Sequence, residues 1–336
     1  MTKPIDKLMT EKVLRTVRNY EMLFPGDRVL AAVSGGPDSV FLLQVLAGLK
    51  RKLKLGEITV CNLDHQLRGK ESEEDSSFVK SLTGRMGLRY AHKKADIGKI
   101  KSKEISTEET ARSVRYKFFS ECARKFGSNV IATGHTLDDQ AETVIMRLIK
   151  GSSLKGIVGV APVRTHGPYR IIRPLIELEK KEIVACLRAA GAKYRVDSSN
   201  SGNLYFRNTV RNEILPFLER YNPRLKRVLF TLADHLREDF DFIEREKLVA
   251  GSAAARDGAK GQTIELKDII VQPKAIQKEI LRDMLEKSGG SVKKLSFKHW
   301  KDMEALIRRK PKGSSVHLPG GIEIKRTENS LTFTVL

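Results

Sequence analysis

The residues best suited to chemistry form a glycine loop, Ser34-Gly35-Gly36-Pro37-Asp38-Ser39. It follows the apolar run Val29–Val33 and precedes Val40–Leu43, so we expect a strand, a loop and a helix start in that order. The glycines let backbone N–H groups converge, and the helix start adds unpaired donors and a positive dipole end, which together favour an anion. A carboxylate facing phosphates needs a cation between them, so Asp38 is predicted to bind magnesium. The alternative is a plain turn in which Asp38 and Ser39 cap the helix.

A second cluster of polar residues is Gly134-His135-Thr136-Leu137-Asp138-Asp139-Gln140-Ala141-Glu142-Thr143. If a helix begins near Asp138, then Asp139 and Glu142 lie three residues apart on one face. Apolar residues would cover the core face of this helix: Ile145, Leu148 and Ile149. Two carboxylates at a helix start beside an anion site can bind magnesium, orient an ammonium group or accept a proton. The alternative is that they only interact with the helix dipole, next to a structural histidine.

Two further segments place arginines at helical spacing. The capping box Ser106-x-x-Glu109 predicts a helix that carries Arg112 and Arg115 on one face. Arg112 has a local partner in Glu108, so Arg115 is the better phosphate ligand. In the second segment Arg207 and Arg211 share a face and are able to reach a nucleotide or RNA phosphates, although a solvated basic helix is equally compatible with the composition.

The elements that must position these residues alternate between strand and helix patterns. Four short β-branched runs are predicted strands, with helical patterns such as Glu71–Arg85 between them: Val29–Val33, Ile58–Leu63, Leu88–Ala91 and Val130–Thr133. Repeated β-α-β units predict an α/β fold with a Rossmann-like parallel sheet and ligands at the carboxyl ends of its strands. If the first and fourth strands are neighbours, the loops at Ser34 and Gly134 share one crevice.

The alternation stops near Pro216–Pro223, so we divide the chain into domains at 1–218 and 219–336. The second is predicted to be mostly helical. Its first helix starts at Arg224 and carries an apolar stripe: Leu225, Val228, Leu229, Leu232, Leu236, Phe240 and Ile243. The small residues of Gly251–Gly261 indicate a flexible connection. Further helices are expected at 272–287 and 297–309, followed by a terminal hairpin that turns at Glu328-Asn329.

The composition of the chain indicates which kinds of partner it is suited to bind. It has 62 Lys and Arg against 41 Asp and Glu, a net charge of +21, which suits a polyanion such as a nucleic acid. No apolar run approaches the roughly 20 residues of a membrane helix, and the N-terminus lacks a signal peptide pattern. Cys61, Cys122 and Cys186 are odd in number and far apart, as expected for buried reduced thiols in a cytoplasmic protein.

These segments together resemble known proteins. The loop at Ser34 is similar to the pyrophosphatase-type ATP loop S-G-G-x-D-S of enzymes that split ATP between the α and β phosphates. Over about the first 220 residues the chain resembles the bacterial tRNA(Ile)-lysidine synthetase family. The matching stretches are S-G-G-P-D-S at Ser34, N-L-D-H-Q-L-R-G at Asn62, E-E-T-A-R-S-V-R-Y at Glu108, G-H-T-L-D-D-Q-A-E-T at Gly134, Y-F-R-N-T-V-R-N at Tyr205 and, near the end, L-P-G-G at Leu318.

The resemblance implies a reaction and its participants. ATP adenylates the C2 carbonyl oxygen of the wobble cytidine in a tRNA(Ile) with a CAU anticodon, and the ε-amino group of free L-lysine then displaces AMP to leave lysidine. The implied domains are an ATP-binding adenylating domain at 1–218 and a tRNA-binding domain at 219–336, with ATP and Mg²⁺ as cofactors. No membrane is involved, and a homodimer is one option for the assembly.

The resemblance also assigns site residues. The catalytic residues are Arg115, Asp139, Glu142 and Arg207, Asp38 holds the metal, and the ATP site comprises Ser34, Gly35, Gly36, Pro37, Asp38, Ser39 and His135. Arg115 and Arg207 would steady the α-phosphate, and Asp139 or Glu142 would hold the lysine.

Two departures and two alternatives accompany this assignment. Thr136 stands where many members have a second histidine, and we expect the additional C-terminal module of longer members to be absent because the chain ends at Leu336. A tRNA thiolation enzyme uses a similar loop, but no C-x-x-C occurs here and no cysteine lies in a motif. A non-catalytic RNA-binding protein is a further alternative, against which the intact acidic and basic motifs argue.

Overall fold

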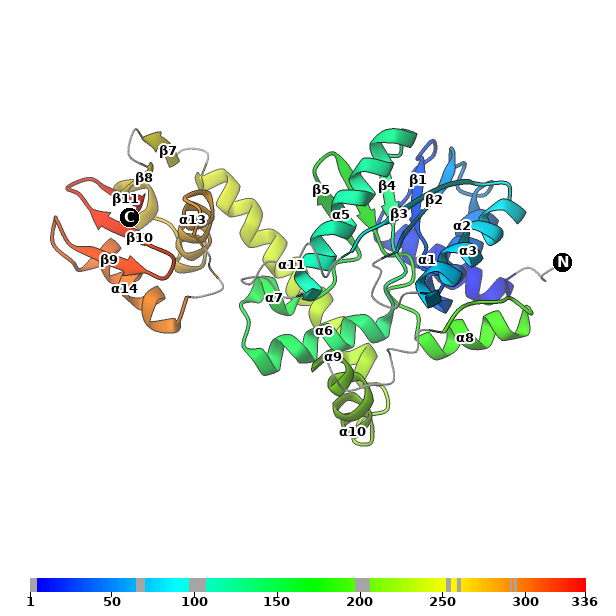
Figure 1. The fold of residues 1–336 in the computed structure, drawn as a ribbon. Helices are drawn as coiled ribbons and strands as arrows, with labels where there is room; N and C mark the ends of the chain where they lie inside the picture. Colours follow the sequence, from blue (N-terminus) through cyan, green and yellow to red (C-terminus); the bar gives the residue numbers. More distant parts are fainter. Residues whose placement is uncertain are drawn as a thin grey trace. The chain divides into compact units, whose positions relative to one another are not determined.

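The structure, a computed structural model, describes residues 5–64, 70–96, 107–196, 206–251, 255–258, 261–290, 292 and 295–336. The chain divides into two compact units, 1–234 and 235–336. The elements that begin in the first unit are α1 (Lys7–Asn19), β1 (Val29–Ala32), α2 (Pro37–Leu49), β2 (Ile58–Asp64), α3 (Lys70–Arg85), β3 (Arg89–Lys94), α5 (Thr107–Phe126), β4 (Val130–Ala132), α6 (Leu137–Lys150), α7 (Leu154–Ile157), β5 (Val163–His166), β6 (Tyr169–Ile172), α8 (Lys180–Ala189), α9 (Phe206–Thr209), the π-helix η2 (Val210–Ile214), α10 (Leu215–Glu219) and α11 (Leu225–Gly251) (Figure 1).

The first unit is built on a six-stranded sheet in the order β3-β2-β1-β4-β6-β5. Five strands run parallel, which confirms the predicted fold class, and β1 lies between β2 and β4. The strand β5 is antiparallel to β6 because the Gly167-Pro168 turn reverses the chain, with Gly167 in the left-handed region at φ 56°. The sequence did not predict this edge hairpin. Since β1 and β4 are neighbours, their carboxyl ends bring the two polar clusters together.

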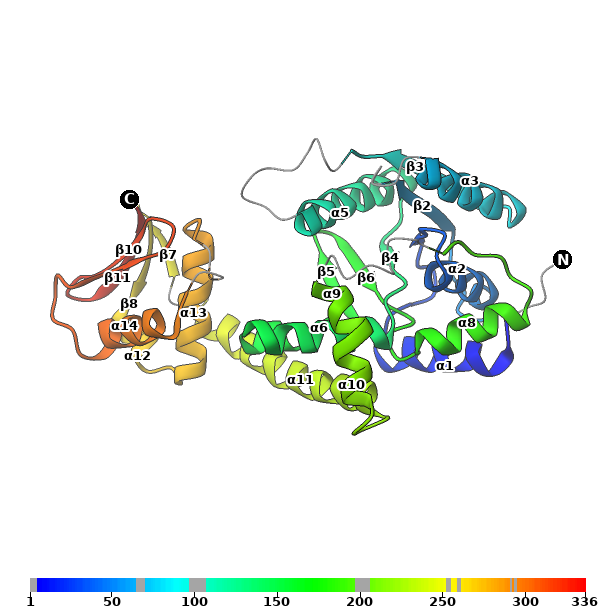
Figure 2. The ribbon, with the colours of Figure 1, turned by 60° about the horizontal axis from the view of Figure 1, so that its bottom comes forward.

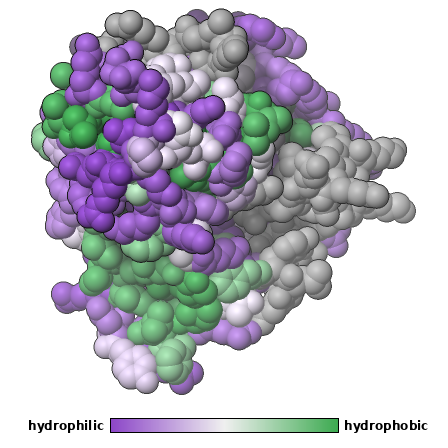
Figure 3. Space-filling view, turned by 90° about the vertical axis from the view of Figure 1, so that its left-hand side faces the viewer, coloured by the Kyte–Doolittle hydropathy of each residue, from purple (hydrophilic) through white to green (hydrophobic). Residues whose placement is uncertain are grey.

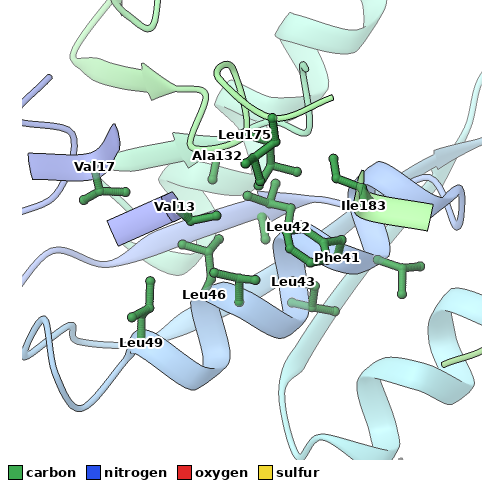
Figure 4. Packing of buried hydrophobic residues seen from close by; sticks show 14 of the residues in the cluster. Val13, Val17, Phe41, Leu42, Leu43, Leu46, Leu49, Ala132, Leu175 and Ile183 are labelled. Carbon is green, nitrogen blue, oxygen red and sulfur yellow. The ribbon is translucent and has the colours of Figure 1, made fainter. Parts of the chain in front are cut away.

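Helices cover both faces of this sheet. Figure 2 shows α5 on one side of the strands and α1 and α8 on the other. The helix α2 is apolar on most sides because it is packed between the sheet and the neighbouring helices α1 and α8. Figure 4 shows this core, which includes Val13, Val17, Phe41, Leu42, Leu43, Leu46, Leu49, Ala132, Leu175 and Ile183. On the opposite face Tyr116, Phe118 and Phe119 of α5 pack over Leu30 and Ile131. The glycine loop is therefore anchored between two buried elements, β1 and α2.

The core face of α6 differs from the predicted one. Ile145 is buried as expected, but Leu148 and Ile149 are 48% and 55% exposed. The packed face instead includes Ala141 and Val144, which contact η2, α10 and α11. The prediction was wrong because it weighted only the large apolar residues, whereas the small side chain of Ala141 permits close packing at the start of the helix.

The first turns of α11 belong to the first unit. Leu229 and Ala233 join the cluster formed by α6 and η2, so this unit extends to Asp234, beyond the predicted boundary at 218. Val228 and Leu232, which the predicted apolar stripe included, are exposed. None of the helices in the described ranges is long and apolar enough to cross a membrane.

The second unit combines helices with a sheet. Its elements after α11 are β7 (Ala255–Gly258), β8 (Gly261–Glu265), α12 (Leu266–Ile270), α13 (Lys274–Lys287), α14 (Phe297–Arg308), β9 (Ser315–Leu318), β10 (Ile322–Arg326) and β11 (Ser330–Val335). The strands pair in the order β7-β8-β11-β10-β9, and β10 and β11 form the hairpin expected at the C-terminus. The flexible connection expected at 251–261 is wrong in part, because Ala255–Gly258 pairs with β8. Alternating apolar residues of β10 and β11, such as Ile324 and Phe333, bury one face of this sheet.

Candidate active site

The glycine loop forms the tight connection from β1 to α2. Gly35 has φ 97°, a left-handed conformation that favours glycine, and Gly36 is the N-cap of α2. The hydroxyl of Ser39 accepts hydrogen bonds from the N–H groups of Ser34 and Gly35, each at 3.2 Å, and donates to the Gly36 carbonyl at 2.9 Å. Pro37 is the first helical residue and has no N–H to offer. Ser39 therefore fixes the curl of the loop and engages the N–H groups of Ser34 and Gly35, which leaves those of Gly36, Asp38 and Ser39 as candidate anion donors.

Asp38 is the acid predicted to bind magnesium. Its Oδ2 lies 3.1 Å from the Lys180 ammonium, whereas its Oδ1 is buried and has no hydrogen-bond partner in the described structure. Burial raises the pKa of Asp38 to about 6, although Lys180 lowers it. A buried, unpartnered carboxylate oxygen beside an anion loop fits a cation ligand. The described residues contain no group of three or more His, Cys, Asp or Glu able to hold a metal by themselves, which is compatible with Mg²⁺ held by one carboxylate together with phosphates.

The second polar cluster lies against the glycine loop. At Gly134 an added Cβ would lie 3.2 Å from backbone atoms of Asp38 and Ser39, so a side chain here would require the glycine loop to shift. The ring Nδ1 of His135 lies 2.9 Å from the Thr133 hydroxyl. Burial lowers the pKa of His135, so its imidazole is neutral at physiological pH. The shared crevice predicted from the strand order is present.

Asp139 is the third residue of α6 and forms a capping box with Thr136, the N-cap. Its Oδ2 accepts hydrogen bonds from the Thr136 N–H at 2.9 Å and the Thr136 hydroxyl at 3.0 Å, while Oδ1 accepts from Arg207 at 3.1 Å. Burial raises the pKa of Asp139, but the Arg207 guanidinium and the hydrogen bond from the Thr136 N–H outweigh burial, and the net pKa is lowered. Thr136 is thus a helix cap, the role for which its hydroxyl is suited, and Asp139 is an ionised side chain on the cavity wall.

Glu142 occupies a different environment. It is 1% exposed and is absent from the wall of the cavity. Its carboxylate accepts from Arg207 Nε at 2.7 Å and from Arg211 Nε at 2.6 Å. The shared face predicted for Arg207 and Arg211 is therefore present, and the face is directed at Glu142. Because Arg207 also contacts Asp139, this buried ion-pair cluster links α9 and η2 to the start of α6.

A cavity of about 300 Å³ lies over these loops. Its polar lining includes the glycine loop, Asp38, His135, Asp139 and Arg115. Its apolar lining includes Cys61 and Leu63 of β2 and Tyr116 and Phe119 of α5. Polar donors together with apolar and aromatic groups suit the phosphates and the base of a nucleotide.

Several residues of this region were not predicted from the sequence. Lys180 reaches Asp38 from the first turn of α8, more than 140 positions along the chain, and no local pattern marks it. Arg173 is 2% exposed, and its signal was a lone arginine inside the apolar stretch Ile171–Ile176. Arg112 stacks on the Tyr116 ring, 5.1 Å from its centroid. The Glu108 side chain, His65–Gly69 of the Asn62 motif, and Tyr205 lie outside the described residues.

Comparison with known proteins places this geometry in a family. A model of the PP-loop domain matches residues 6–218. The tRNA(Ile)-lysidine synthases of Clostridioides difficile and Geobacter sulfurreducens are 33% and 32% identical, over 97% and 98% of this chain and 71% and 69% of theirs. The U34-tRNA thiolase NcsA of Methanococcus maripaludis shares the fold, with a TM-score of 0.57, 19% identity, and coverage of 68% of this chain and 78% of that chain. The chain belongs to the tRNA(Ile)-lysidine synthase family and carries the PP-loop domain of that family.

Proposed function

We propose that this protein ligates lysine to C2 of the wobble cytidine of a tRNA(Ile) with a CAU anticodon, through an adenylated tRNA. The observation that carries the proposal is the single cavity in which the anion loop, the unpartnered Asp38 oxygen and the ionised Asp139 meet. The family membership and the net charge of +21 support a tRNA substrate. Both ATP and tRNA are available in the cytoplasm, where we place the reaction.

Adenylation requires ATP to be held with its α-phosphate facing the nucleotide. The loop N–H groups bind the phosphates, and Asp38 and Lys180 flank them with opposite charges. Asp38 would hold Mg²⁺, which neutralises phosphate charge when it is bound. Arg115 supplies a cation at the cavity wall for the charge that develops on the α-phosphate. Arg207 supplies a second cation for the α-phosphate, and its ion pairs with Asp139 and Glu142 fix its position.

Lysine attack requires an ammonium group to be held and then deprotonated. Asp139 faces the cavity and is ionised, so it is suited to bind the ammonium by charge. Because its pKa is lowered, Asp139 is a weak acceptor for the proton of the lysine ammonium, so we assign it the role of a counter-ion. Glu142 is engaged by two arginines and buried, so we assign it the positioning of Arg207 and Arg211. Of the two carboxylates that the sequence left open, Asp139 is our choice for lysine.

The chemistry of the cysteines disfavours thiolation. A persulfide carrier needs an accessible thiolate with a low pKa. Cys61 lines the cavity, but burial raises its pKa well above the ordinary value, and burial raises the pKa of Cys122 to about 11. All three cysteines are buried and unbonded. These thiols are suited to packing in the core, so the site supports lysine ligation better than tRNA thiolation.

The experiment is incubation of the protein with ATP, labelled lysine and total tRNA, followed by nuclease digestion and identification of the labelled nucleoside. We expect label in a single modified cytidine, dependent on ATP. An Asp38→Ala variant with an intact circular dichroism spectrum is the control and should yield none. Label in no nucleoside, or equal labelling by the variant, contradicts the proposal.

A further inference from the structure

Three arginines surround the aromatic ring of Tyr116 on α5. The guanidinium of Arg164 lies 4.4 Å from the ring centroid and that of Arg112 lies 5.1 Å from it. Arg173 donates a hydrogen bond to the Ala161 carbonyl and lies near enough to Tyr116 to lower the pKa of its hydroxyl. We call Arg112, Arg164 and Arg173 the arginine cluster. Tyr116 forms part of the cavity wall, and the arginine cluster lies behind this wall, around the ring.

The arginine cluster carries charge that the described protein does not balance. No carboxylate in the described ranges forms an ion pair with any of its three members, in contrast to Arg207 and Arg211, which share Glu142. Arg173 is 2% exposed, and the Nε atoms of Arg173 and Arg164 are buried without a hydrogen-bond partner in this part of the structure. Buried guanidinium groups are stable in proteins when an anion accompanies them. Arg173 is the buried member of the cluster, and an anionic ligand near it would supply this missing charge.

The pKa shifts of Tyr116 and Arg173 also indicate a positive electrostatic potential around the arginine cluster. Burial raises the pKa of Tyr116, but Arg112, Arg173 and Arg164 outweigh this effect and the net pKa is lowered. Burial lowers the pKa of Arg173 to about 10, and Arg164 and Arg112 lower it further while Tyr116 opposes them. Both shifts have the sign expected beside uncompensated cations.

The strand order separates the arginine cluster from the glycine loop. Arg173 follows β6, and Arg164 on β5 pairs with Ile171 near the same end of the sheet. The glycine loop follows β1, and β4 lies between β1 and β6. Strands are spaced by about 4.8 Å, so the cluster is roughly 10–14 Å from the loop. The glycine loop already supplies a phosphate site, so a second anion at this distance belongs to another phosphate group.

We propose that the arginine cluster binds a backbone phosphate of the RNA substrate, next to the nucleotide that is presented to ATP. This assignment deepens the proposed function and rests on it for the identity of the RNA. Planar guanidinium groups bind phosphate oxygens through paired N–H donors, which suits a phosphodiester. The arginine cluster would thus position the RNA, while the glycine loop and Asp38 hold ATP.

The test compares Arg164→Gln and Arg112→Gln with Arg124→Gln, an exposed arginine on the same helix α5 that serves as the matched loss of one charge. Affinity for unmodified tRNA(Ile) is measured by filter binding over a series of salt concentrations, and ATP binding is measured separately by calorimetry. We expect each cluster variant to bind tRNA about tenfold more weakly or worse, with the salt slope reduced by about one. ATP affinity and the behaviour of Arg124→Gln should stay near wild type.

Two outcomes overturn the proposal, and a third overturns only the proposed function. If the cluster variants lose ATP affinity and keep tRNA affinity, the phosphate belongs to ATP. If they bind tRNA as Arg124→Gln does, the arginine cluster binds no RNA phosphate. A wild-type protein that binds tRNA through the cluster but incorporates no lysine would refute the proposed function and leave the arginine cluster as an RNA phosphate site. The binding assay therefore separates the two proposals.

Discussion

We expect the ionised carboxylate of Asp38 to lower the free energy of unfolding while it serves the reaction. In the folded protein its pKa is raised from 3.8 to about 6, so the folded state disfavours the ionised form. This difference corresponds to about 3 kcal/mol at neutral pH. The sign follows from linkage: the group carries no penalty below pH 3.8, and the stability of the folded state falls as the pH rises through about 6. Asn cannot ionise, so Asp38→Asn should remove that penalty.

The expected result is a more stable but inactive protein. Without ATP at pH 7.5, Asp38→Asn should raise the free energy of unfolding by about 2–3 kcal/mol and the melting temperature by roughly 4–10 °C. At pH 4 the variant and the wild type should melt together. With Mg²⁺ and ATP the wild type should gain stability and the variant should not, because ligand binding to the native state stabilises it.

Circular dichroism melts at pH 4 and 7.5, with and without Mg²⁺ and ATP, measure these differences. An Asp38→Asn variant that is less stable than the wild type at pH 7.5 without ATP would refute the reasoning. It would mean that the Lys180 contact at 3.1 Å outweighs burial.

Three further results follow from the site. Glu142→Gln removes the charge of the buried carboxylate that Arg207 and Arg211 share and should lower the free energy of unfolding by about 3–5 kcal/mol; denaturant unfolding checks this, and a loss below 1 kcal/mol would show that the remaining partners of the two arginines suffice. Arg115→Ala should slow adenylation by about 10²–10³, whereas Asp139→Asn should accumulate adenylated tRNA that lysine fails to consume; quench-flow with mass spectrometry separates the steps, and equal loss of the first step in both variants would assign Asp139 to the nucleotide. The logarithm of tRNA affinity should fall linearly with the logarithm of salt, with a slope of several units, and a salt-independent affinity would contradict phosphate binding.

The sequence predicted the parts of the site that depend on local pattern. Gly35, Gly36 and the flanking apolar runs specify a strand, a turn and a helix wherever they occur, and the structure contains them at β1 and α2. The capping box of Thr136 and Asp139 is equally local but was not predicted, because the helix was expected to begin near Asp138 and it begins at Leu137. Strand order required the additional argument that parallel β-α-β units bring loops to one edge, and the pairing of β1 with β4 confirms it.

Other features depend on contacts that no local pattern encodes. Lys180 meets Asp38 only because α8 packs against α2, and the separate environments of Asp139 and Glu142 arise from the positions of α9 and η2. The five-stranded sheet of the second unit was predicted only at its terminal hairpin. Its remaining strands pair over long sequence separations, as in the contact of β8 with β11. Figure 3 shows one face of the molecule, on which hydrophilic residues cover the upper part and a continuous apolar patch lies in the lower part.

The most direct test of the account is to trap the intermediate. The protein is incubated with ATP, Mg²⁺ and unmodified tRNA(Ile) in the absence of lysine, and the anticodon fragment is analysed by mass spectrometry before and after lysine is added. We expect the fragment to gain the mass of one AMP at the wobble cytidine and then to exchange AMP for lysine. An unchanged fragment, or AMP found on the protein in place of the tRNA, would contradict the account.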